Sequence, residues 1–259
     1  MIRVLLCDAD GCLFPSEEPA FVASTAITNQ LLADLGVPRR FEPDELQAYA
    51  VGKNFRATAL DLADAYGVAL RPDELARWVR AEQDAVTEHL RGVLRPDPAV
   101  GEPLARLAER FELAVVSSSA LARLAACFTA TGLDELLPPE VRFSAEDSLA
   151  VPTSKPDPAV YAFAGRRLGV AGAEGLAIED SVAGARSAVA AGFPTVGNLA
   201  FVPEHARPAR AVALEEAGVS ALVESWSDLE HWLRREALDD ASAVARDAPA
   251  AGVGGPGGA

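Results

Sequence analysis

The sequence predicts an α/β protein: a parallel β-sheet with helices on both faces, and an all-helical segment inserted after the first strand. Three observations predict this class. Residues 2–7, IRVLLC, form a continuous apolar run, which is typical of a strand buried on both faces. Residues 17–91 then show helical spacing and no convincing strand. Beyond residue 94, short apolar runs alternate with helical patterns, which indicates strands joined by crossover helices.

Start and stop signals divide the chain into elements. Within the insertion, a first helix ends near Gly36, Pro43 and Pro72 each open a helix, and Gly92 follows the last one. The elements expected after it are helices at 99–110, 120–131, 157–169, 182–192 and 227–238, and strands at 113–117, 141–144, 175–180, 194–198 and 221–225. The Ala-, Gly- and Pro-rich end, 239–259, is predicted to be a disordered tail.

Composition and charge narrow the function classes. The 259 residues are 50% hydrophobic and 24% charged, with a net charge of −15, as in an ordinary globular protein. No apolar run reaches the length of a membrane span, and the N-terminal run lacks the basic start of a signal peptide. We therefore expect a cytoplasmic protein that binds neither membranes nor, without a basic patch, nucleic acid. An anionic substrate would need a metal ion or placed cations.

Cysteine, histidine and lysine usage adds little support for zinc or histidine chemistry. The three cysteines match no zinc pattern and are expected to be buried apolar thiols, and the three histidines are scattered. Only two lysines, Lys53 and Lys155, stand among 21 arginines. A retained lysine suggests a need for its compact ammonium group, although chance would also explain either one.

Polar side chains stand at the end of, or beside, four predicted strands. In an open parallel sheet, ligands bind beyond the carboxyl ends of the strands, so these groups are expected to share one pocket. They are Asp8 and Asp10 after the first strand, Ser117, Ser118 and Ser119 after the next, Lys155 in a later loop, and Glu179 and Asp180 after the strand at 175–180.

This set of groups suits phosphoryl transfer. Carboxylates can hold Mg²⁺, and one of them can attack phosphorus. Ser117 and nearby backbone amides can bind phosphate oxygens, and Lys155 supplies positive charge. Each group alone has a plain alternative: a solvated turn, a helix start, a loop lysine or a helix-opening acid. Those alternatives do not explain all four occurring together at strand ends.

The order of these motifs resembles the haloacid dehalogenase-like hydrolase superfamily, in the branch with a helical cap after the first strand. DADGCLF, VVSSS, SKPDPAVY and IEDSVAGARSAVAAG resemble its four motifs in order, over about residues 2–235. The resemblance implies a Rossmann-like core at 1–15 and 93–238 and an all-helical cap at 16–92.

The resemblance also implies residue roles. Asp8 would be the nucleophile that forms an aspartyl-phosphate, and Asp10 the general acid and then the general base. Ser117 and Lys155 would hold the phosphoryl group, with Ser118 and Gly11 beside the substrate. Asp180, Asp8, the carbonyl group of Asp10 and the supporting Glu179 would hold Mg²⁺.

The presence of Asp10 separates this chain from members with other chemistries. Dehalogenases and phosphonatases lack the second aspartate, and phosphomutase relatives usually carry a cap histidine where this chain has Ala20. The expected function is a Mg²⁺-dependent phosphatase acting on a small phosphorylated metabolite, of which a sugar phosphate is one example. A β-phosphoglucomutase-like mutase and a non-catalytic phospholigand-binding relative are the alternatives.

Substrate selection is expected to come from the cap. Lys53 and Arg56, in VGKNFRAT, would face the pocket and bind polar groups of the substrate, although a solvated helix start explains them equally well. The protein is expected to be a monomer or a weak homodimer.

Overall fold

The fold is built on a six-stranded parallel sheet. The computed structural model describes residues 2–50 and 54–235. The strands stand in the order β3-β2-β1-β4-β5-β6, which places the first strand of the chain near the middle of the sheet. Their bounds are β1 Val4–Cys7, β2 Glu112–Ser117, β3 Arg142–Ser144, β4 Gly175–Glu179, β5 Thr195–Asn198 and β6 Ala221–Val223. Every described pairing is parallel.

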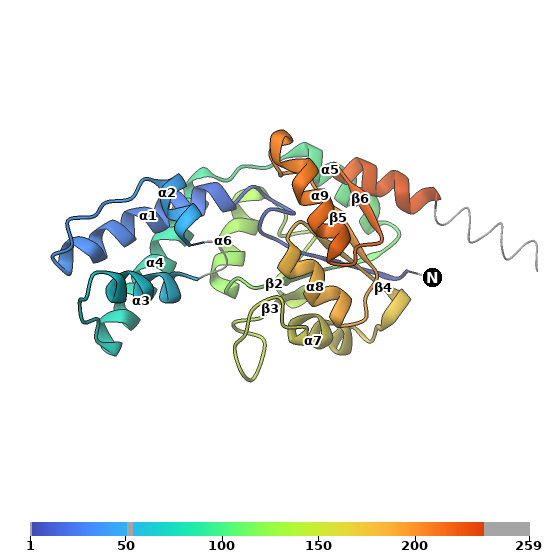
Figure 1. The fold of residues 1–259 in the computed structure, drawn as a ribbon. Coiled ribbons are helices and arrows are strands. Elements are labelled where there is room, and N and C mark those ends of the chain that lie inside the picture. Colours follow the sequence, from blue (N-terminus) through green and yellow to red (C-terminus); the bar gives the residue numbers. More distant parts are fainter. Residues whose placement is uncertain (1, 51–53, 236–259) are drawn as a thin grey trace, which may run out of the picture.

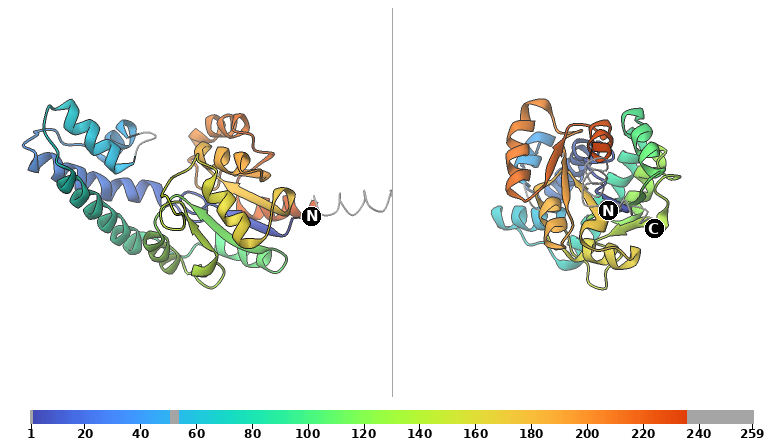
Figure 2. Two further views of the ribbon diagram at one scale, coloured as in Figure 1. Left: turned by 90° about the horizontal axis from the view of Figure 1, so that it is seen from below. Right: turned by 90° about the vertical axis from the view of Figure 1, so that its right-hand side faces the viewer.

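Helices cover both faces of this sheet because β1 and its neighbours are apolar on both sides. On one face, Leu5 and Cys7 pack with α5 (Pro98–Ala108), α6 (Leu121–Thr131) and the helix at 226–235. On the other, Val4 and Leu6 pack with α7 (Ala159–Leu168) and α8 (Val182–Ala190). The views of Figures 1 and 2 show this layered core, with α9 (Arg207–Glu216) beside α8.

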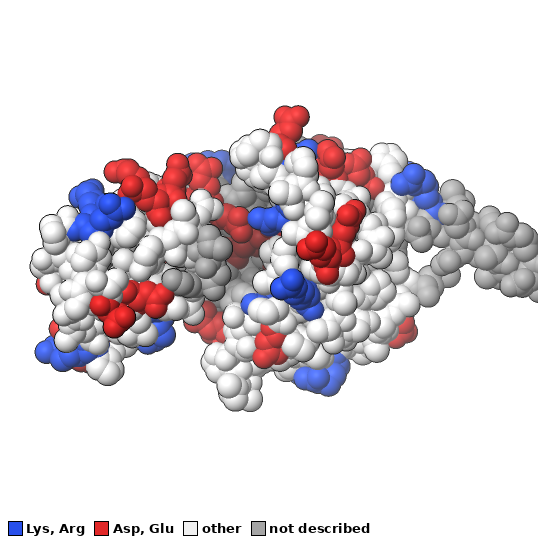
Figure 3. Space-filling model, in the orientation of Figure 1, with Lys and Arg blue, Asp and Glu red and all other residues white. Residues whose placement is uncertain are grey.

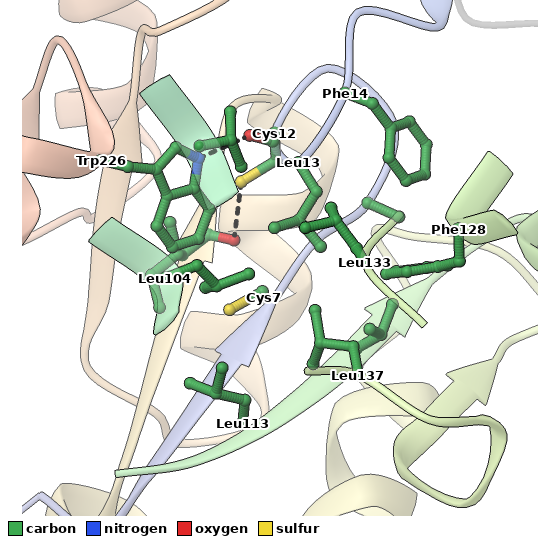
Figure 4. Close-up of a cluster of buried hydrophobic side chains, with 14 of the residues drawn as sticks. Cys7, Cys12, Leu13, Phe14, Leu104, Leu113, Phe128, Leu133, Leu137 and Trp226 are labelled. Carbon is green, nitrogen blue, oxygen red and sulfur yellow. Dashed lines mark hydrogen bonds between the residues drawn. The ribbon is translucent and has the colours of Figure 1, made fainter. Parts of the chain in front are cut away.

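One buried hydrogen bond ties the C-terminal helix to the loop after β1. The indole Nε1 of Trp226 donates to the carbonyl oxygen of Cys12 at 3.0 Å, deep among apolar side chains (Figure 4). The Cys12 thiol donates to the carbonyl oxygen of Ile178. Cys7, Cys12 and Cys127 are free and buried, as expected from the sequence. These contacts hold the loop that carries Asp8 and Asp10 against the core.

The cap is a group of helices that extends from one side of the core (Figures 1 and 2). It contains α1 (Glu17–Asp34), α2 (Pro43–Tyr49), α3 (Phe55–Ala65) and α4 (Pro72–Val93). The long helices α1 and α4 pack against each other, and α4 also packs against α6 of the core. Val86 and Leu90 of α4 belong to the main hydrophobic cluster, so the base of the cap is continuous with the core.

The predicted fold class is confirmed, including the inserted helical cap. The structure adds α9, which the sequence analysis did not predict; its run RPARAVALEE is rich in charged residues, and most of its apolar residues are small alanines. The residue bounds of the domains stay a prediction. The predicted tail and Lys53 lie outside the described residues. Within the described ranges no helix is both long and apolar enough to cross a membrane.

Candidate active site

Strand register brings the predicted acids to one end of the sheet. Cys7, the last residue of β1, pairs with Val115 of β2 and with Ile178 of β4. The backbone N–H of Asp8 donates to the carbonyl oxygen of Ile178 at 2.9 Å. Asp8 therefore lies beside Glu179 at the end of β4. Ser117, the last residue of β2, and Asp180, the residue after β4, lie at the same carboxyl-terminal end of the sheet.

The Lys155 ammonium group lies among these carboxylates. Its Nζ donates to Asp8 Oδ1 and to Glu179 Oε1, each at 2.5 Å, and to the carbonyl oxygen of Val116 at 2.7 Å. The Lys155 side chain is 6% exposed. Tyr161 of α7 donates its hydroxyl to the same Glu179 oxygen at 2.5 Å. A charge in this position is held by three oxygens and cannot move freely.

Three carboxylates form a cluster that could hold a cation. One oxygen from each of Asp8, Glu179 and Asp180 lies within 4.8 Å of the others, and all three residues are buried. Glu179 Oε2 and Asp180 Oδ1 are buried and have no hydrogen-bond partner in the described part of the chain. Unpartnered buried acceptors are costly, so these two oxygens are candidate ligands for a cation.

The pKa values of the cluster follow from its burial. Burial raises the pKa of Asp8 despite the adjacent Lys155, and raises that of Glu179 to about 7. Burial and then the neighbouring Asp8 charge raise the pKa of Asp180 well above its usual range. For Lys155, burial opposes the charge, but Asp8 and Glu179 raise its pKa overall. Burial therefore opposes ionisation of these acids, and when all three are ionised together the cluster has an excess of negative charge that a divalent cation would offset.

Asp10 lies in a different environment from Asp8. Its Oδ2 accepts a hydrogen bond from the Ser119 hydroxyl at 2.6 Å, and its Oδ1 accepts from Arg123 at 2.8 Å and from the Ser16 hydroxyl. Burial raises the pKa of Asp10, but Arg123 and the two serines lower it overall. The pKa values of these two carboxyls, two residues apart, are therefore shifted in opposite directions.

The loop after β2 and the turn after Asp10 shape the rest of the site. The Ser117 hydroxyl accepts from the backbone N–H of Ser119 at 3.0 Å, and the Ser118 hydroxyl accepts from that of Lys155 at 3.1 Å. Gly11 has a φ of +77°, and a Cβ there would overlap the Asp180 carboxylate. A residue with a side chain would both strain this turn and displace Asp180.

The structure brings together the core residues selected from the sequence at one end of the sheet. Arg56 is exposed near the start of α3, so its predicted role stays a prediction. Sequence reasoning missed Arg123, Ser16 and Tyr161. It also missed Arg210 of α9, which donates to the carbonyl oxygen of Asp180 at 2.7 Å. Acidic and basic side chains lie on both sides of the junction between cap and core (Figure 3).

A family model of haloacid dehalogenase-like hydrolases matches residues 2–192. The chain therefore belongs to this family and is a hydrolase. No curated protein matches the chain.

Solved structures share the fold across nearly the whole chain. A haloacid dehalogenase family hydrolase from Deinococcus radiodurans R1, with bound phosphate and sodium, is 27% identical, with a TM-score of 0.66 over 92% of this chain and 97% of that one. CbbY from Rhodobacter sphaeroides, in complex with phosphate, is 24% identical, with a TM-score of 0.68 over 88% of this chain and 96% of that one. A conserved haloacid dehalogenase-like protein of unknown function from Agrobacterium tumefaciens C58 is 22% identical, with a TM-score of 0.67 over 92% of this chain and 100% of that one.

Proposed function

We propose that this hydrolase is a Mg²⁺-dependent phosphatase that cleaves a small phosphomonoester through an aspartyl-phosphate on Asp8. The observation that carries the proposal is the buried cluster of Asp8, Glu179 and Asp180, in which Lys155 contacts two of the three acids. When all are ionised, three carboxylates and one ammonium leave an excess of negative charge that matches a divalent cation. The residues that would hold Mg²⁺ are Asp8, Asp180 and the carbonyl group of Asp10, supported by Glu179.

The donor set fits a hard cation. All candidate ligands are oxygens, and two of them are buried without a hydrogen-bond partner among the described residues. When bound, Mg²⁺ would neutralise phosphate charge and the repulsion between the acids.

Each residue of the site then has its own role in the reaction. Asp8 attacks phosphorus and forms an acyl phosphate as the bond from phosphorus to the leaving oxygen breaks, while the Lys155 ammonium compensates charge on the phosphoryl oxygens. Asp10 protonates the leaving alcohol and later accepts a proton from the water that hydrolyses the aspartyl-phosphate. Ser117, Ser118 and the amides at the start of α6 supply hydrogen bonds to the phosphoryl group. Lys53 and Arg56 of the cap are proposed to contact the rest of a small metabolite.

The comparisons support phosphate chemistry at the level of the family. The Deinococcus radiodurans hydrolase was solved with phosphate bound, and CbbY was solved both with phosphate and, as a mutant, with xylulose-1,5-bisphosphate. A substrate of that general kind, a sugar phosphate, is therefore a reasonable first member of a test panel.

A panel of phosphomonoesters, assayed for free phosphate with Mg²⁺ and with a chelator, tests the proposal. The wild-type protein should release phosphate only with Mg²⁺. Asp8→Asn should lower kcat at least ~10³-fold because the amide is a poor nucleophile. Asp64→Asn, on the exposed face of α3, is the matched control and should leave the rate unchanged.

Two outcomes would overturn this function. The first is the absence of phosphate release from every ester, and the second is an unchanged rate in Asp8→Asn. Melting curves test Mg²⁺ binding independently of turnover. Mg²⁺ should raise the melting temperature of the wild type and raise that of Asp180→Asn less. Isomerised sugar phosphate without free phosphate would indicate a mutase. Ligand-induced stabilisation without turnover would indicate a phospholigand-binding protein.

A further inference from the structure

The two oxygens of the Asp10 carboxylate have unequal partners. Oδ1 accepts hydrogen bonds from the Arg123 guanidinium, at 2.8 Å, and from the Ser16 hydroxyl. Oδ2 accepts from the Ser119 hydroxyl alone, at 2.6 Å. Arg123 can only donate, whereas a serine hydroxyl can rotate and accept. A proton on Oδ2 is therefore compatible with this network, because Ser119 can turn its lone pair toward it, while Oδ1 facing Arg123 cannot carry a proton in that direction.

Arg123 is built into the site rather than resting on its surface. It lies in the first turn of α6, and its side chain is 26% exposed. Its Nη2 makes the ion pair with Asp10 Oδ1 at 2.8 Å, and its Nε is buried without a hydrogen-bond partner in the ranges that the structure describes. A charged hydrogen bond from a largely buried guanidinium fixes the position of the carboxylate that accepts it.

The position of Arg123 also connects Asp10 to the cap. Helix α6 packs against α4 of the cap, at the junction of the two parts (Figure 1). Glu82 of α4 is half-buried and interacts electrostatically with Arg123. Arg123 thus interacts with an acid of the cap as well as with the acid that the proposed mechanism uses for proton transfer.

We propose that Arg123 is a positioning residue for the reaction: it anchors Asp10 through Oδ1 so that Oδ2 faces the leaving group and carries the transferred proton. This inference rests on the proposed phosphatase function. In the first step Asp8 forms the new O–P bond, the bond from phosphorus to the leaving oxygen breaks, and the proton on Asp10 Oδ2 moves to that oxygen. In the second step water attacks phosphorus, the Asp8–phosphorus bond breaks, and a proton of the water returns to Oδ2.

A comparison of two aryl phosphates tests this role. The 4-nitrophenolate group leaves with little help from an acid, whereas phenolate needs a proton, and both esters have similar size. In Arg123→Met, kcat/KM for phenyl phosphate should fall ~10²-fold, since positioned general acids contribute about 10²–10⁴-fold. For 4-nitrophenyl phosphate it should fall less than about fivefold. Hydrolysis of the aspartyl-phosphate follows loss of either leaving group, so it does not affect this ratio.

Two further variants complete the design. Arg123→Lys keeps a cationic donor and should recover about tenfold of the loss with phenyl phosphate, which a purely packing role would not predict. Arg166→Met makes the same substitution at an exposed position of α7 and should change neither ester. If Arg123→Met does not fold, the ratio of the two esters in Arg123→Lys decides, and a ratio equal to that of the wild type with an undiminished rate overturns the proposal.

Other results would contradict the positioning role directly. Equal losses with both esters would mean a general effect on the site, and a rise in KM with kcat unchanged would mean a direct substrate contact. If the wild type turns over neither ester with Mg²⁺ and the wider panel also fails, the phosphatase function fails. If the wild type is active and the ester ratio is insensitive to Arg123, only the role of Arg123 fails.

Discussion

At the scale of single residues, the site depends on close approach as much as on charge. Gly184 lies in the first turn of α8, and a Cβ at this position would overlap the Glu179 carboxylate. The Oε1 atom of the same carboxylate accepts hydrogen bonds from Lys155 and Tyr161. Helix α8 can therefore lie close to the end of β4 only because residue 184 has no side chain.

Substituting Gly184 should damage the proposed Mg²⁺ site more than the fold. In Gly184→Ala the added methyl displaces Glu179, so the Mg²⁺ concentration for half-maximal activity should rise by about tenfold or more. Titration of phosphatase activity with Mg²⁺ measures this. Gly101→Ala, in α5, is the matched control because a Cβ there meets no atom within 4 Å. It should be neutral or stabilise the helix by about 0.5–1 kcal/mol. An unchanged Mg²⁺ requirement in Gly184→Ala would contradict this account.

The site residues that could be predicted from the sequence share a local signal. Asp8, Ser117 and Asp180 end or follow apolar runs, and a parallel sheet brings such ends together whatever the rest of the chain does. Arg123 and Tyr161 have no such signal, because each lies within a helix of ordinary composition. Whether an arginine in LARLAAC faces solvent or Asp10 depends on how α6 packs on the sheet, which sequence periodicity does not specify.

At the scale of elements, α1 begins without a side-chain hydrogen bond from its N-cap residue. Ser16 occupies the N-cap position, yet its side chain makes no hydrogen bond to the helix and donates instead to Asp10. By contrast, Asp97 accepts from the backbone N–H of Ala99 at 2.9 Å and caps α5. The Ser16 side chain therefore contacts the loop that carries Asp8 and Asp10 and makes no hydrogen bond to the first turn of α1.

The different hydrogen-bond partners of Ser16 and Asp97 predict opposite effects for their substitution by alanine. Ser16→Ala should lower kcat by about tenfold, because Asp10 loses one of its three donors, without faster amide exchange in the first turn of α1. Asp97→Ala should leave kcat unchanged, speed exchange at the start of α5 and reduce the free energy of unfolding by about 0.5–2 kcal/mol. Steady-state kinetics and hydrogen exchange measure the two effects. Fraying of α1 in Ser16→Ala would show that the serine is an ordinary helix cap.

At the scale of the whole molecule, the hydrophobic clusters described in the cap differ in their connections to the core. The base of the cap, including Leu90 of α4, belongs to the same cluster as β1 and α6. Away from the base lie two separate clusters, one that includes Leu62 of α3 and Leu46 of α2, and one that includes Leu75 of α4. Because residues that share a cluster support one another, the base of the cap should unfold together with the sheet, whereas the far end can open locally.

Three leucine-to-alanine substitutions test this division. Leu90→Ala should cost about 2–5 kcal/mol and raise hydrogen exchange in both α4 and β1, since the cavity lies in a cluster that they share. Leu62→Ala removes an equally buried side chain, and its effect on exchange should stay within α1, α2 and α3. Leu60→Ala, at a position that is 45% exposed, should change stability by less than about 0.5 kcal/mol. If Leu90→Ala left the exchange of β1 unchanged, cap and core would be independent folding units, and the cap base could not transmit its position to the site through packing.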